Sequence, residues 1–228
     1  MGIRPELTRP PSLILLHGIG TGPGAWEPQV EALAGDREVL ALDLVPAYRR
    51  GLEAAVEEVR RLASAYRPVD FCGLSLGAIV ALRVAAERFD EEDRLVVCAG
   101  FQCLPPGIRR RVRGLAAVAR FVPKGFLHRQ LVAELPEPYR ARALEEIAPL
   151  RPRELSRLMW EAAAAEVDPS RIVARTLVLC GDRDKANLPL SRALAQGVPN
   201  SRFELVPDAG HVANLDNPAA FSALLSAS

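Results

Sequence analysis

The chain has 228 residues and a mass of 24.7 kDa, with 29 basic and 28 acidic side chains and a formal net charge of +1. Because 49% of the residues are hydrophobic and 25% are charged, the composition excludes a disordered chain and favours one globular domain with a sizeable core. The charge balance gives no reason to expect nucleic acid as a partner, and no apolar run reaches the length of a membrane span. Since the N-terminus has no apolar stretch of signal-peptide length, we expect a cytoplasmic protein.

The four cysteines, at positions 72, 98, 103 and 180, could by number form two disulfides. However, Cys72, Cys98 and Cys180 lie in or at the end of apolar runs typical of buried strands. There is no C-x-x-C pair, and the three histidines are scattered along the chain. We therefore predict buried free thiols in a reducing compartment, and no metal site.

Short apolar runs of strand length alternate with helical segments in both outer parts of the chain. Strands are predicted at 12–16, 38–44, 69–72, 94–99, 175–180 and 202–206, and helices at 26–34, 51–66, 78–89, 190–196 and 217–225. The strands are apolar throughout instead of alternating with polar residues, which is typical of a parallel sheet covered on both faces. This pattern predicts an α/β fold.

The alternation stops in the middle of the chain, where no strand is predicted between about 104 and 169. Helical pieces separated by prolines are predicted there at 108–121, 124–135, 139–147 and 152–165. The interpretation is an all-helical insertion at 104–169 within an α/β core made of residues 1–103 and 170–228.

A serine stands in the G-x-S-x-G pattern Gly73-Leu74-Ser75-Leu76-Gly77, between a predicted strand and a predicted buried helix. Such a serine needs a tight, strained turn that projects its hydroxyl from the sheet edge, and the glycines leave room for that turn. The helix that follows directs its N-terminus at the serine, so the Leu76 amide can bind a developing negative charge.

A second oxyanion donor is expected from the glycine-rich segment HGIG at 17–20, which follows the first strand. The Ile19 amide is the natural donor, although a simple glycine turn would also explain this segment. His17 itself is interpreted as a structural residue that bonds the loop, and not as the catalytic base. Candidate substrate-contacting residues are His17, Gly18 and Trp160.

Three histidines could serve as the general base that a serine hydroxyl requires. His211 directly follows the last predicted strand, so it lies on the same sheet edge as Ser75. His128 lies among arginines in the helical insertion and is interpreted as a surface residue. We therefore predict His211 as the base.

An acid that orients the imidazole is expected after the strand ending at Cys180, where Asp182 and Asp184 compete. Asp184 lies further into the loop and is preferred, whereas Asp182 is expected to brace the turn or pair with an arginine. Asp208 and Asp216 are close to His211 in sequence, and loop or helix capping explains them.

The order Ser75, Asp184, His211, with HGIG after a strand and GLSLG at the turn, resembles the α/β-hydrolase superfamily. The stretch 177–218 is similar to the branch that contains small carboxylesterases, enol-lactonases and meta-cleavage-product hydrolases. The resemblance implies that the G-x-x-D aspartate, Asp184, is the acid and that the helical insertion is a cap. Because the family's antiparallel hairpin has little room before Ser12, we expect a reduced sheet of about six parallel strands.

The implied reaction is acyl transfer from an ester, thioester or lactone to water through Ser75, which is carboxylesterase-like (EC 3.1.1) and needs no metal or organic cofactor. Alternatives are a non-hydrolytic enzyme with the same triad (haloperoxidase-like or a lyase), a C–C bond hydrolase, or a binding module without catalysis. The expected partner is a small-molecule ester, and the expected state is a monomer or small homo-oligomer.

The insertion is basic, with twelve Arg and Lys against five acidic residues between Pro105 and Trp160, so the rest of the chain is acidic. One interpretation is an anionic substrate attracted to the cap. The other is a solvated outer face, since the run at 109–113 spans all sides of a helix.

Overall fold

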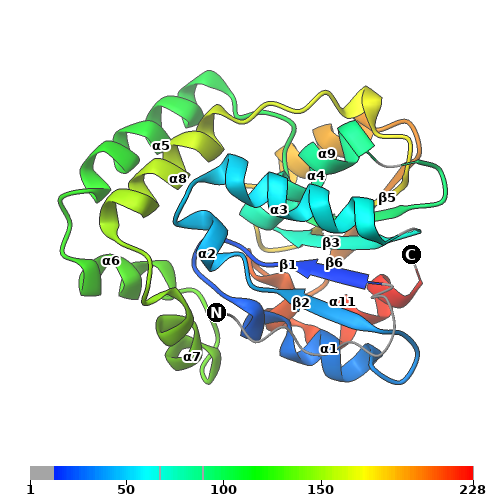
Figure 1. Ribbon diagram of the computed structural model, residues 1–228, viewed down its shortest axis with the longest axis horizontal. Helices are drawn as coiled ribbons and strands as arrows, with labels where there is room; N and C mark the ends of the chain where they lie inside the picture. The colour runs from blue at the N-terminus through cyan, green and yellow to red at the C-terminus, as the bar shows by residue number, and fades with distance from the viewer. Residues whose placement is uncertain (1–12, 67, 89, 228) are drawn as a thin grey trace.

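The computed structural model describes residues 13–66, 68–88 and 90–227, and its centre is a six-stranded parallel sheet (Figure 1). The strands, in the spatial order β2-β1-β3-β4-β5-β6, are β1 (Leu13–Leu16), β2 (Val39–Leu42), β3 (Asp70–Leu74), β4 (Arg94–Cys98), β5 (Arg175–Gly181) and β6 (Ser201–Val206). All five neighbouring pairs are parallel, which confirms the predicted sheet. The expectation that no antiparallel hairpin precedes β1 concerns residues 1–12, which lie outside the described residues.

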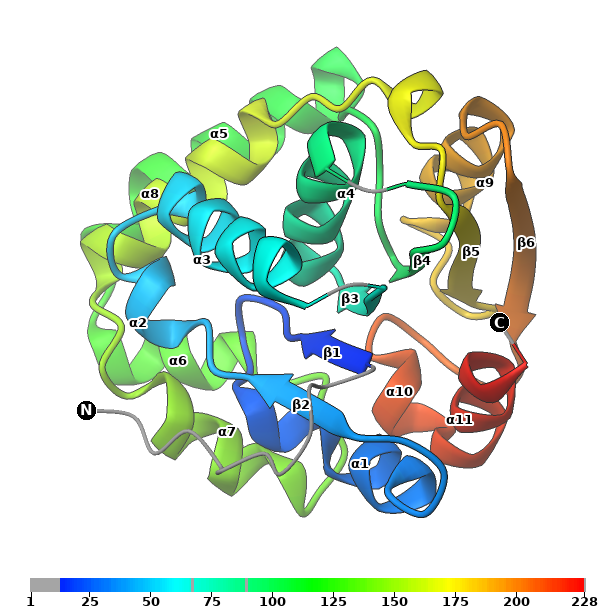
Figure 2. The same cartoon turned by 45° about the vertical axis from the view of Figure 1, so that its right-hand side comes forward.

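Two groups of helices cover the two faces of the sheet (Figures 1 and 2). The helices of the core are α1 (Glu27–Leu33), α2 (Val45–Tyr48), α3 (Leu52–Ala65), α4 (Leu76–Arg88), α9 (Leu188–Gly197), α10 (Ala213–Asp216) and α11 (Pro218–Ser226), with 3-10 turns η1 (Pro23–Trp26) and η2 (Pro169–Arg171). Helices α3, α4 and α9 lie on one face, and α1, α10 and α11 lie on the other. The inner strands are therefore shielded from water on both sides.

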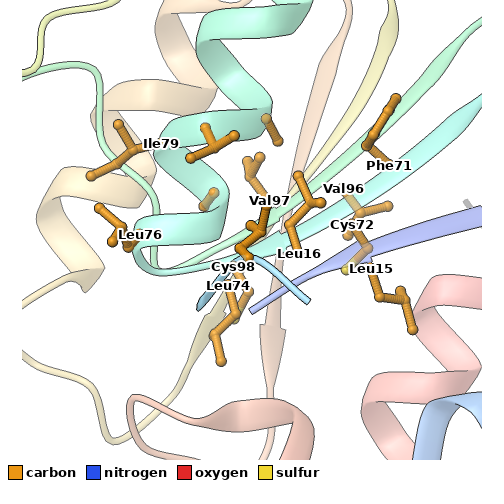
Figure 3. Packing of buried hydrophobic residues seen from close by; sticks show 14 of the residues in the cluster. Leu15, Leu16, Phe71, Cys72, Leu74, Leu76, Ile79, Val96, Val97 and Cys98 are labelled. Carbon is orange, nitrogen blue, oxygen red and sulfur yellow. The ribbon is translucent and has the colours of Figure 1, made fainter. Parts of the chain in front are cut away.

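The core is packed from the central strands and from α4 (Figure 3). Every residue of β1 is fully buried, and β4 is buried from Leu95 onward. On α4, Leu76 and Ile79 are also buried, as the predicted buried helix requires. Burial of this kind contributes about 25 cal/mol per Å² of apolar surface and fixes the strand ends from which the site is built.

Four helices lie between β4 and β5: α5 (Pro106–Ala119), α6 (Lys124–Leu131), α7 (Tyr139–Ile147) and α8 (Pro152–Ala164). They lie together on the side toward which the carboxyl ends of the strands point, with α5 packed along α8 (Figures 1 and 2). The described part of the chain from 104 to 169 contains no strand, as predicted. The helix predicted over 124–135 ends earlier, at Leu131, and a turn follows at 132–134.

All four cysteines are free, and Cys72, Cys98 and Cys180 are buried. Cys103 is exposed. Within the described ranges, none of the helices is long and apolar enough to span a lipid bilayer.

Candidate active site

Ser75 lies on a sharp turn between β3 and α4, and its φ of 55° is in the left-handed region that non-glycine residues rarely adopt. The turn is held by the Ser75 N–H, which donates to the Cys98 carbonyl at 2.9 Å. A Cβ added at Gly77 would lie 2.1 Å from the Leu16 carbonyl oxygen, and one at Gly73 would lie 2.5 Å from the Gly77 oxygen. Both glycines are thus required by contact with the backbone, which is the physical reason for the motif.

His211 connects Ser75 to Asp184 through hydrogen bonds at both ring nitrogens. His211 Nε2 lies 3.1 Å from Ser75 Oγ, and His211 Nδ1 lies 3.0 Å from Asp184 Oδ2. The three side chains come from the ends of β3, β5 and β6, which meet at one edge of the parallel sheet. The structure therefore brings together the three residues that the sequence singled out.

Asp184 is nearly buried, with 7% of its surface exposed. Burial raises the pKa of its carboxyl group, but the hydrogen bonds to His211 and Asn187 together lower it more, so the net pKa lies below the ordinary value. The carboxylate consequently stays charged beside the imidazole.

Asn187 is a site residue that the sequence analysis missed. Its side-chain amide donates to both oxygens of Asp184, at 3.0 and 2.8 Å, and its backbone N–H donates to Oδ1 at 3.1 Å. No signal in the sequence pointed to this role, because it depends on a turn in which the Asp184 side chain accepts from the backbone three residues later. Asn187 thus fixes the orientation of the Asp184 carboxylate.

Two aspartates other than Asp184 brace the loop that carries His211. Asp182 accepts hydrogen bonds from the backbone N–H groups of Asp208 and Ala209, both at 3.1 Å. Asp216 accepts from the Gly210 N–H at 2.7 Å. These contacts agree with the turn-bracing and capping roles expected for these acids.

His17 is fully buried behind the site and does not contact the hollows beside Ser75. Its Nε2 accepts from the Leu44 N–H at 3.0 Å, so the proton resides on Nδ1, which lies 2.9 Å from the Gly18 carbonyl. The hydroxyl of Tyr48 donates to the His17 carbonyl at 2.8 Å. The expectation that His17 contacts substrate is wrong, because hydrogen bonds within the fold occupy both nitrogens of its ring. These contacts favour the interpretation that His17 holds the loop in place.

The burial of His17 predicts acid sensitivity of the fold. Desolvation lowers the pKa of His17 from 6.5 to about 4. Between these values the unfolded chain binds a proton that the folded chain excludes, so stability falls as the pH drops from 6.5 toward 4. We expect His17 to account for a loss of about 2.5 kcal/mol in unfolding free energy between pH 7 and 4.5.

Urea denaturation at the two pH values measures this loss in the wild type and in His17→Gln. The variant should be less stable at pH 7, but its stability should depend less on pH, by about that amount. An equal pH dependence in both proteins would contradict the assignment.

Two hollows meet at Ser75, and both are lined by Ser75 and Ile19. The apolar hollow has a volume of about 260 Å³. The histidine-side hollow has a volume of about 270 Å³. The apolar hollow is lined further by Leu76, Ile79, Phe101, Leu104, Ile108, Val112, Met159, Ala162, Ala163, Ala186, Asn187 and Leu190. The histidine-side hollow is lined further by Gly18, Gly20, Thr21, Leu74, Gln130, Leu131, Glu134, Leu135, His211 and Val212.

The two residues expected to supply oxyanion donors both lie close to Ser75. Leu76 is the first residue of α4, where a helix leaves its amides without partners inside the helix. Ile19 lines both hollows, and a Cβ added at the neighbouring Gly18 would lie 3.4 Å from the Ser75 Cβ. Glycine at 18 therefore allows the loop to approach the serine closely.

Trp160 is not part of the site. Its side chain is 47% exposed on α8 and lies under the Arg113 guanidinium, whose central carbon is 5.0 Å from the ring centre. Its neighbour Met159 lines the apolar hollow instead. The expectation that Trp160 contacts substrate is therefore wrong, since the preceding position of the helix, Met159, faces the hollow instead.

The basic residues of the insertion lie away from both hollows. Arg109 pairs with Glu166, Arg142 with Glu27, and Arg140 with Glu137. Among the residues that the structure describes, no arginine or lysine lines either hollow. These positions favour the solvated outer face over the interpretation as an anion site.

In the described segments, the His, Cys, Asp and Glu side chains form no group of three or more that could hold a metal ion.

Comparison with known proteins assigns the chain to a family. Residues 13–224 match the model of the alpha/beta hydrolase family, and the chain belongs to that family as one of its enzymes. A pimeloyl-(acyl-carrier protein) methyl ester esterase from Vibrio atlanticus is 32% identical over 94 residues, which cover 39% of this chain and 36% of that relative.

Two further proteins are similar over nearly the whole chain. A 2-succinyl-6-hydroxy-2,4-cyclohexadiene-1-carboxylate synthase from Escherichia coli is 27% identical, covering 95% of this chain and 92% of that relative. The crystal structure of a hydrolase from Pseudomonas aeruginosa superposes with a TM-score of 0.77 and 25% identity, covering 97% of this chain and 90% of that one.

Proposed function

We propose that the chain is a serine hydrolase that cleaves carboxylic esters, thioesters or lactones of small molecules. The observation that carries this proposal is the chain of hydrogen bonds from Ser75 Oγ through His211 to Asp184, with distances of 3.1 and 3.0 Å. A serine and a histidine within hydrogen-bond reach, with an acid orienting the histidine, form the arrangement that activates a hydroxyl nucleophile.

In the proposed reaction, Ser75 Oγ attacks the substrate carbonyl while His211 Nε2 accepts its proton. The amides of Leu76 and Ile19 hold the oxyanion, and Asp184 stabilises the charged imidazole. His211 then returns the proton to the leaving alcohol, which departs and leaves an acyl group on Ser75. Water attacks this ester with His211 again as base, which releases the acid and restores the serine.

The two hollows suggest how a substrate divides between them. The group that protonates the leaving alcohol must lie beside it, and His211 lines only the histidine-side hollow. The leaving alcohol is therefore assigned to that hollow and the acyl chain to the apolar hollow. Because no charged side chain lines the apolar hollow in the described structure, we propose an uncharged, apolar acyl group.

Residues 104–169 are proposed to act as the cap of this site. Ile108, Val112 and Met159, from α5 and α8, line the apolar hollow, while Gln130 and Glu134 line the other. Substrate selectivity is thus assigned to the insertion, and the chemistry to the core.

Esters of one alcohol with acyl chains of increasing length test the proposal. We expect kcat/KM to rise about fourfold per methylene until the acyl chain fills the hollow. Val112→Phe narrows the apolar hollow and should shorten the longest acyl chain accepted. Val118→Phe is the matched control, because Val118 is 62% exposed on the same helix and lines neither hollow.

Three results would count against the proposal. The first is the absence of ester cleavage, and the second is cleavage that does not depend on acyl length. The third is an equal response of the two variants, which would place the acyl chain outside the apolar hollow. Release of the free acid, measured directly, distinguishes hydrolysis from elimination by the same triad.

A further inference from the structure

The histidine-side hollow contains one unpaired charge that the proposed reaction does not use. In the described chain, Glu134 is the one Asp, Glu, Arg or Lys that lines either hollow. It follows α6 in the cap, in a turn near the carboxyl ends of the strands. Glu134 therefore lines the same hollow to which the leaving alcohol is assigned.

Among the residues that the structure describes, Glu134 has no counter-ion. Neighbouring cap acids are paired, Glu137 with Arg140 and Glu146 with Arg142. Among the described side chains, no ion pair or hydrogen bond involves the Glu134 carboxylate, although the stretch from Pro105 to Trp160 carries an excess of seven positive charges. An unpaired carboxylate in a largely basic segment is a local reversal of charge.

We propose that Glu134 determines leaving-group specificity and favours esters of cationic amino alcohols. This inference rests on the proposed function, because it needs His211 and the leaving alcohol in the same hollow. Gln130 and Thr21 line the same hollow, so an ammonium group on the alcohol would enter a space lined by one acidic and two neutral polar side chains of the cap and the glycine-rich loop. An anionic alcohol would instead meet Glu134 as a like charge, which is unfavourable.

The size of the expected preference follows from the exposure of Glu134. The residue is exposed, so its attraction to a cation is screened by water and contributes at the level of surface ion pairs. We expect Glu134 to favour a cationic over an uncharged alcohol by about fivefold in kcat/KM. Because the attraction acts on the bound substrate as well as on the transition state, most of the change should be in KM.

The test uses three esters with the same short apolar acyl chain. Their alcohols are choline, which is cationic, 3,3-dimethylbutanol, which has the same shape without charge, and glycolate, which is anionic. The alcohols differ in intrinsic reactivity, so the quantity compared between proteins is the ratio of kcat/KM for the choline ester to that for the dimethylbutyl ester. The proteins are the wild type, Glu134→Gln and the matched control Glu145→Gln, whose residue is exposed on α7 and lines neither hollow.

We expect the ratio to fall about fivefold in Glu134→Gln, with the glycolate ester improving in that variant. Glu145→Gln should keep the wild-type ratio, and added salt should lower the ratio in the wild type but not in Glu134→Gln. An unchanged ratio in an active Glu134→Gln enzyme would overturn the inference and leave the ester hydrolase intact. An equal fall in both variants would also overturn it, because the effect would then come from the overall field of the cap. If no ester is cleaved in a Ser75-dependent manner, the proposed function fails and this inference fails with it.

Discussion

Ser75→Ala is expected to lower kcat for ester hydrolysis by at least about 10⁴-fold. Without the hydroxyl there is no nucleophile to form the acyl-enzyme, and His211 can only promote attack by water. The residual rate should come from the two oxyanion amides and from substrate binding, so KM should change little. Initial rates with a saturating short-chain ester measure the loss.

The fold of Ser75→Ala provides the control for this result. Alanine at a φ of 55° carries the same backbone strain as serine, so the variant should unfold at a similar urea concentration. Ser64→Ala is the matched substitution, because Ser64 is exposed on α3. A folded Ser75→Ala protein that keeps more than about a hundredth of the wild-type kcat would show that Ser75 is not the nucleophile.

Asp184→Asn is expected to lower kcat by about 10³- to 10⁴-fold. The new amide can donate to His211 Nδ1, which then accepts, and the imidazole proton moves to Nε2, where it faces Ser75 Oγ. In that tautomer His211 cannot accept the serine proton. The charge that stabilises the imidazolium is lost as well.

Asp182→Asn distinguishes the two aspartates after β5. Because Asp182 contacts the backbone of Asp208 and Ala209, its replacement should cost about 1 kcal/mol in unfolding free energy and less than about tenfold in kcat. Rates and urea denaturation curves of both variants give the comparison. If Asp182→Asn were the slower enzyme, the roles assigned to the two acids would have to be exchanged.

Much of the fold was predictable because the sheet is parallel and buried. Short, continuously apolar segments such as β1 are typical of buried parallel strands, so their assignment was straightforward. The apolar α4, which directly follows β3, was likewise predicted to be a buried helix. The turn at Ser75 was predictable for a related reason. The backbone of Leu16 leaves no room for a side chain at Gly77. The turn therefore requires glycine at that position, and the sequence pattern reveals the turn.

The parts that were not predictable depend on side-chain direction. The helical pattern of α8 did not decide between Met159 and Trp160, and the inward residue is Met159. The excess of cap arginines could not be located from a count, because charge composition carries no direction. Glu134, which opposes that excess, lies at the site.

The geometry of individual turns could not be predicted from the sequence either. Asn187 gained its role from a turn in which its backbone and its side chain both reach Asp184. Nothing in the composition of that loop separated Asn187 from an ordinary surface residue. In the same way, the division of the site into two hollows arises from the packing of α5, α6 and α8 around Ser75.

The central claim is that Ser75 is an activated nucleophile, and the most direct test is the mass of the protein after incubation with a fluorophosphonate. The wild type should gain one phosphonyl group with loss of fluoride, located by peptide fragmentation on Ser75, while folded Ser75→Ala should gain none. A folded wild type that remains unmodified, or a Ser75→Ala protein that is modified equally fast, would contradict the claim.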